Sequence, residues 1–151
     1  MRTQKQRGFT LVEVLIALLV LSFGLLGIAN LQLSGVSTSR ASFERSQAAL
    51  LANEIVERIR ANLPAATAGN YNLSSGATAA TPTSNCIGVS ANCSPADLAA
   101  ADLAYWQARV NSVLSGTDAV IQVNVSAGIA RSVNLTLSWG SNDVTIVAEL
   151  T

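Results

Sequence analysis

The chain has 151 residues, of which 50% are hydrophobic and only 12% are charged, about half the usual charged fraction. Its length allows one compact domain beside a membrane anchor. From Phe9 onward six arginines stand against nine acidic residues, a net charge of −3, which argues against nucleic-acid binding because phosphate recognition needs clustered Lys or Arg. The sequence has no histidine and no lysine after Lys5. Without these side chains we expect no enzyme, no cofactor and no metal site.

A membrane-length apolar run begins close to the N-terminus. The first eight residues, MRTQKQRG, are basic and free of acids, and 21 mostly apolar residues follow from Phe9 to Ala29. As a helix this run is about 31 Å long, which matches a bilayer core of about 30 Å. Because positive charge stays on the cytoplasmic side, we expect residues 1–8 inside and the C-terminal domain outside. A cleaved secretory signal is the weaker alternative, since the run is long and no clear Ala-x-Ala site follows it.

Glu13 is the only charged residue between Arg7 and Arg40. An acid at the centre of a membrane span costs about 2.5–3.5 kcal/mol on insertion scales. One interpretation places Glu13 near the cytoplasmic face, where it reaches the lipid headgroups. In the other, Glu13 pairs with an α-amino group, which lies one helical turn away if the mature chain begins at Phe9. Such a pair is most useful between neighbouring chains.

The segment Arg7-Gly8-Phe9-Thr10-Leu11-Val12-Glu13, followed by the apolar run, resembles the type IV prepilin signature. The resemblance implies that a membrane-bound prepilin peptidase cuts between Gly8 and Phe9. It also implies that Phe9 is then N-methylated. Glu13 becomes the fifth mature residue, which is the glutamate that this family needs for assembly.

Helical periodicity continues beyond the apolar run. Apolar residues recur at steps of three and four, namely Ala48, Leu51, Ala52, Ile55, Ile59 and Leu63. Glu54 and Arg58 form an i,i+4 pair, and we expect the helix to end at Pro64. The N-terminal part of the chain is therefore predicted to comprise a cleaved basic leader (1–8), a transmembrane and assembly helix (9–33), and an amphipathic continuation of that helix (34–63).

The remainder, 64–151, is predicted to form a globular head. Residues 64–93 are poor in core-forming side chains and indicate a long surface αβ loop, in which Tyr71 is the one candidate for an exposed aromatic residue. Ser94-Pro95-Ala96-Asp97 is typical of a helix start and indicates a short helix over 95–115. Over 119–151 apolar residues alternate with polar ones between turn signals, which predicts a three-stranded antiparallel sheet.

The expected fold class is α+β, with the long N-terminal helix packed on a small antiparallel β-sheet. Type IV pilins have this architecture. Cys86 and Cys93 flank six residues in the αβ loop, and outside the cytoplasm such a pair can oxidise. We expect a disulfide between them, with free thiols as the alternative.

Two stretches of the helix, Arg45–Ala48 and Leu51–Asn62, resemble the PilV-type minor pilins, and Asp102-Leu103, Trp106 and Trp139 are similar to the same group. The cysteine pair precedes the sheet, unlike the C-terminal disulfide loop of many major pilins. This position argues against a major subunit.

The resemblance implies a minor pilin that initiates or caps a type IV pilus together with other minor pilins and the major pilin. Its other partners would be prepilin peptidase, the inner-membrane pilus assembly machinery and, before assembly, membrane lipid. The expected location is the inner membrane, in a single pass with a periplasmic C-terminal domain, and then the pilus at the cell surface. Two alternatives stay open: a pseudopilin of a type II secretion tip complex, and a tip adhesin that uses the αβ loop.

Overall fold

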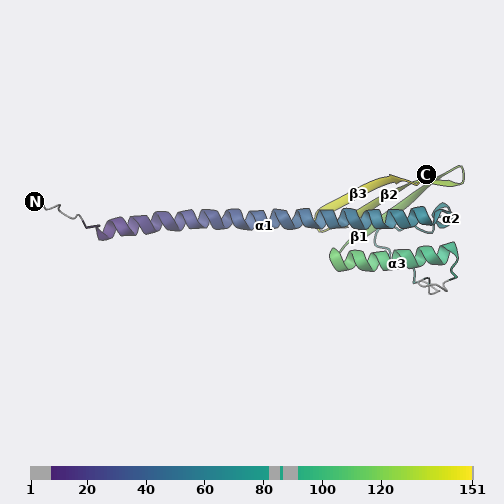
Figure 1. Ribbon diagram of the computed structural model, residues 1–151, viewed down its shortest axis with the longest axis horizontal. Coiled ribbons are helices and arrows are strands. Elements are labelled where there is room, and N and C mark those ends of the chain that lie inside the picture. The colour runs from purple at the N-terminus through teal and green to yellow at the C-terminus, as the bar shows by residue number, and fades with distance from the viewer. Residues whose placement is uncertain (1–7, 82–85, 87–91, 151) are drawn as a thin grey trace, which may run out of the picture. The chain divides into compact units, whose positions relative to one another are not determined.

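The computed structural model describes residues 8–81, 86 and 92–150. Three helices precede three strands along the chain (Figure 1): α1 (Leu11–Ala61), α2 (Leu63–Thr67), α3 (Pro95–Val113), β1 (Asp118–Ser126), β2 (Ile129–Trp139) and β3 (Asn142–Glu149). The chain divides into two compact units, residues 1–41 and 42–151. The leader residues 1–7, much of the distal αβ loop (82–85 and 87–91) and Thr151 lie outside the described residues.

The first unit contains the apolar half of α1. An 18-residue window of this helix has a mean hydropathy of 2.6, and none of that window is buried within the chain. Large apolar side chains are exposed all along it, from Leu11 at 80% to Val36 at 70%. The helix is long and apolar enough to span a bilayer, as the sequence predicts.

The second unit is an α+β head, which confirms the expected fold class. One face of α1 enters its core through residues spaced by three and four: Ala48, Leu51, Ala52, Ile55, Val56 and Ile59. The indole Nε1 of Trp106 on α3 donates to the Leu51 carbonyl at 2.7 Å, and that of Trp139 on β2 donates to Glu44 Oε2 at 3.2 Å. Helix α1 is therefore held to both α3 and the sheet by buried apolar contacts and indole hydrogen bonds.

The sheet is antiparallel with strand order β1-β2-β3. Central strand β2 buries every second side chain from Val133 to Trp139, in agreement with the alternation in the sequence. The β1–β2 turn places Ala127 at φ 52° and Gly128 at φ 74°, the two left-handed residues of a type I′ hairpin. A register shift between Asn124 and Val125 leaves Val125 45% exposed, although the alternation predicts it to be buried.

The start of the αβ loop differs from the expectation of a surface segment. Pro64 does not end the long helix, because α1 ends at Ala61 and Pro64 lies in the first turn of α2, where its missing N–H costs nothing. Ala65 and Ala66 of α2 are buried in the core. Leu73 is also buried and forms an antiparallel bridge with Ile121 of β1. This part of the loop belongs to the head core.

Candidate processing and assembly site

The start of α1 is capped by Thr10. The Glu13 N–H donates to the Thr10 carbonyl at 3.1 Å and to Thr10 Oγ1 at 3.3 Å, and the Val14 N–H donates to the same carbonyl at 3.3 Å. Thr10 is therefore the N-cap, and Thr10 and Glu13 have the spacing of a capping box. Gly8 and Phe9 precede the cap in non-helical backbone. The peptide bond between them lies outside helical hydrogen bonding, where an enzyme can bind it in an extended form.

No contact with the described residues requires a glycine at position 8. A Cβ built on Gly8 meets no atom of the described residues within 4 Å, and the backbone is not left-handed there. Gly8 is also exposed.

Phe9 and Glu13 are both on the surface of the first unit. Phe9 is 83% exposed, and Glu13 is exposed on the first turn of an apolar helix. The Glu13 carboxylate makes no hydrogen bond or ion pair with any residue that the structure describes. Nothing in that part of the chain offsets the cost of placing this charge among apolar side chains.

Cys86 and Cys93 form a disulfide with their Cα atoms 5.6 Å apart, which confirms the pairing expected from the sequence. Cys93 directly precedes Ser94, the N-cap of α3, whose Oγ accepts from the Asp97 N–H at 3.2 Å. The disulfide therefore joins the distal part of the αβ loop to the start of α3. Closing so short a loop stabilises a fold by about 2–3 kcal/mol in the chain-entropy account.

A buried polar cluster joins α1, α3 and the loop at the end of the head where α3 begins. Asp102 is only 8% exposed, and it accepts from Arg58 Nη1 at 2.8 Å and from the Tyr71 hydroxyl at 2.8 Å. Asn62 Nδ2 donates to the Tyr71 oxygen at 3.2 Å and to the Pro95 carbonyl at 2.8 Å. Every member thus has a partner, and the cluster stabilises the junction.

The expectation of an exposed Tyr71 is wrong, because its ring is fully buried. Burial raises the pKa of the Tyr71 phenol, and its hydrogen bond to Asp102 acts in the same direction. Burial acts to lower the pKa of Arg58, but the hydrogen bonds to Asp102 and Glu54 outweigh it and raise that pKa. The predicted pair of Glu54 and Arg58 is present at 3.0 Å. These groups therefore satisfy one another.

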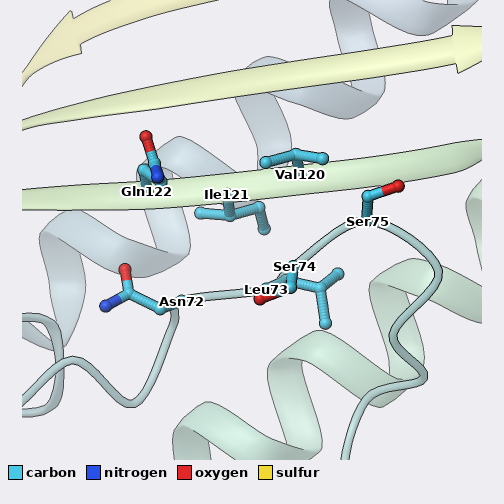
Figure 2. A pocket seen from close by; sticks show the side chains of 7 residues that line it. All are labelled: Asn72, Leu73, Ser74, Ser75, Val120, Ile121 and Gln122. Carbon is cyan, nitrogen blue, oxygen red and sulfur yellow. The ribbon is translucent and has the colours of Figure 1, made fainter.

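A shallow cavity of about 410 Å³ lies between the loop segment 72–75 and β1 (Figure 2). It is lined by Asn72, Leu73, Ser74, Ser75, Val120, Ile121 and Gln122. These are apolar or uncharged polar side chains, without an aromatic ring. The described residues contain no group of three His, Cys, Asp or Glu side chains able to hold a metal ion. We therefore assign no catalytic or ligand-binding role to this cavity.

An apolar helix of membrane length, a capped start beside a Gly–Phe bond and an α+β head define a membrane-anchored protein with pilin architecture. Residues 3–29 match the prokaryotic N-terminal methylation motif, and residues 30–104 match the family of the type IV pilin Tt1218. The two matches adjoin, and the chain belongs to the type IV pilin family. No curated protein and no solved structure matches the chain.

Membership of the type IV pilin family indicates how the chain is processed and what kind of protein it is. Its family is structural and is not a family of enzymes. The methylation motif implies processing by prepilin peptidase and assembly into a pilus. The exposed apolar helix is the membrane anchor of such a subunit.

Proposed function

We propose that this chain is a minor pilin of the PilV type, which initiates or caps a type IV pilus together with other minor pilins and the major pilin. One observation carries the part of the proposal that concerns assembly with other subunits. The first half of α1 is apolar on all sides, unburied within its chain, and carries one acid that has no partner among the described residues. Such a helix is stable in lipid before assembly and beside other helices afterwards.

The processing site is proposed at the bond between Gly8 and Phe9, with methylation at Phe9. The absence of any contact with the described residues that requires a glycine at position 8 supports recognition by a peptidase. After the cut, the new amine of Phe9 lies near the first turn of α1. Glu13 pairs with the Phe9 amine of a neighbouring subunit, and the buried pair then penalises neighbours that pack out of register.

The division of the chain follows from this processing. The leader (1–8) is removed on the cytoplasmic side, the helix over 9–33 spans the membrane and later joins the filament, and its continuation (34–63) carries the head (64–151). The head is periplasmic, where the Cys86–Cys93 disulfide can form. A minor rather than a major role is supported by the resemblance over Arg45–Asn62 and by the disulfide, which precedes the sheet.

The test is to delete the gene and to count surface pili and secreted proteins in the same cells. We expect few or no pili with normal secretion, and full recovery when the wild-type gene is returned. The matched control is Gly8→Val, which should not restore pili although the described residues leave room for the larger side chain at position 8. Normal pili with failed secretion would identify a pseudopilin, and normal pili with normal secretion would overturn the initiation role.

A further inference from the structure

The two edges of the sheet differ in how well they are protected from pairing with a further strand. At the β1 edge the loop supplies hydrogen-bond partners: Leu73 and Ile121 exchange two backbone bonds of 2.9 Å, and the Val123 N–H donates to Asn72 Oδ1 at 2.8 Å. Next to them, Asp118 accepts from the Gly76 N–H at 2.8 Å and from Ser75 Oγ at 2.5 Å. Figure 2 shows the loop lying along the strand. No further strand can pair with residues 118–123 of β1 without displacing the loop.

The β3 edge has little protection. Leu150 donates to Arg131, so even-numbered residues from Asn142 to Leu150 bond to β2, and the N–H and C=O groups of the odd-numbered residues point outward. Among the outward groups of β3, the Glu149 carbonyl is the one with a partner in the described residues, because Arg60 donates to it twice, at 2.7 and 3.1 Å. Within the described part of the chain, the outward groups of Thr145 and Val147 make no backbone hydrogen bond. An open edge of this kind is a template for another strand.

Side-chain exposure along β3 agrees with a missing neighbour. The inward-facing residues Val144, Ile146 and Ala148 are only partly buried, whereas their counterparts on β2 are buried. Val147, at the middle of the edge, is 69% exposed. A strand added beside β3 would cover these three inward-facing side chains with its own alternate residues.

The charges on β3 indicate which kind of strand fits. In the antiparallel register that overlaps residues 143–149 of two copies, Asp143 of each copy lies opposite Glu149 of the other. Like charges directly opposite each other destabilise a strand pair, so β3 is poorly suited to pair with itself. A different strand, with basic residues at both ends and apolar residues at alternate inner positions, would place a positive charge opposite Asp143 and another opposite Glu149. Both end pairs would then attract each other.

We propose that the β3 edge binds an extended strand of a different pilin-family subunit, with basic residues facing Asp143 and Glu149. This inference rests on the proposed role in a complex of minor pilins. The strand adds to the sheet beyond β3 and hydrogen-bonds to the outward backbone groups of Thr145 and Val147. Arg60 marks one end of the binding stretch, because it already occupies the Glu149 carbonyl.

The test uses the full chain in detergent micelles, with backbone amide exchange measured by NMR. The probe is the peptide Lys-Val-Thr-Val-Thr-Val-Lys, and the matched control peptide carries Glu in place of both Lys residues. We expect the first peptide to slow exchange of the Thr145 and Val147 amides about tenfold, because both N–H groups become hydrogen-bonded. It should bind about tenfold more tightly than the control, since it has attractive charges at both ends.

Two variants separate edge pairing from general binding. Val147→Pro removes one outward N–H without breaking a bond to β2, and should abolish the protection. Val147→Thr keeps that N–H and should behave as wild type. No protection by either peptide would overturn the proposal, as would equal binding of both peptides. Edge amides protected in proportion to protein concentration, without peptide, would identify a second copy as the occupant and overturn it too.

These outcomes are independent of the pilus count. Peptide binding with normal pili after gene deletion would refute the initiation role and leave the edge site intact. If Val147→Pro fails to fold, shown by loss of protection at Leu135 and Leu137 in the core, the comparison of the two peptides on the wild-type chain still decides the proposal.

Discussion

Both halves of α1 carry apolar side chains, but the two halves use them in opposite ways. In the first half apolar residues surround the helix, and none of the 18-residue window is buried within the chain. In the second half most of the apolar residues from Ala48 to Ile59 lie on one face, and that face is buried in the head. The presence of many apolar residues therefore indicates that a helix needs a partner to bury them. Their distribution around the helix indicates whether the rest of the chain can be that partner. The first half needs lipid or other subunits.

The largest expected effect comes from Glu13→Ala, which removes the one charge of the first half. We expect incorporation into sheared pili to fall by about 100-fold or more, because loss of one partner of a buried ion pair costs about 3–5 kcal/mol. Membrane insertion should be retained, since the span becomes more apolar. Incorporation is measured by immunoblot of the pilus fraction, with Ser22→Ala as a control that also removes a polar group from the span. Normal incorporation of Glu13→Ala would refute the pairing role.

Matched substitutions in the two halves should separate their effects on the head. Ile55 is 0% exposed and Ile16 is 56% exposed. Ile55→Ala should lower the free energy of unfolding of the head by about 2–5 kcal/mol, because it leaves a core cavity. Ile16→Ala should change it by less than about 0.5 kcal/mol. Urea unfolding in detergent, followed by the fluorescence of Trp106 and Trp139, measures the free energy of unfolding of both variants. Equal effects of the two substitutions would contradict the different use of the two halves of α1.

A smaller effect is expected where α1 meets the loop. Tyr71→Phe removes the hydrogen bond to Asp102 and should lower the free energy of unfolding by about 0.5–1.5 kcal/mol. The folded-state pKa of Tyr71 is raised, so its stabilising effect is complete below about pH 10 and is lost as pH rises through the folded-state pKa. The wild-type head should therefore lose this contribution in strong alkali, and Tyr71→Phe should not. Identical alkaline unfolding curves would contradict this role.

The smallest effect is expected at the exposed β1 edge. Hydrogen bonds from Gly76 and Ser75 lower the pKa of Asp118, so its contribution is present above the unfolded-state pKa and is lost as pH falls through the folded-state value. Asp118→Asn should speed exchange of the Gly76 amide at neutral pH, with little change in the stability of the whole head. In acid, the wild-type chain should approach the variant. Equal Gly76 exchange in both proteins at neutral pH would show that the carboxylate does not hold the loop.

Local patterns in the sequence were sufficient to predict the main elements. The spacing of Leu51, Ile55 and Ile59 marks the buried face of α1, and the alternation from Val133 to Trp139 marks the central strand. The segment from Gly8 to Glu13 identified the pilin family. Each of these predictions rests on residues that are close together in the sequence.

Contacts between distant residues were not predictable in the same way. Tyr71 lies in a polar stretch without periodicity, and its hydrogen-bond partner Asp102 is 31 residues away in the sequence. The bridge between Leu73 and Ile121 and the bonds from Arg60 to the Glu149 carbonyl also join separate segments. The protection of the two sheet edges follows from these long-range contacts, so it became visible only in the folded chain.

A role in the pilus requires that the apolar half of α1 is kept in the mature protein and that the mature chain begins at Phe9. Intact mass and N-terminal fragmentation of the chain, purified from membranes of cells with an active prepilin peptidase, test this directly. We predict loss of residues 1–8 and gain of one methyl group on Phe9. A mature chain that begins near residue 30, without the apolar segment, would contradict the account.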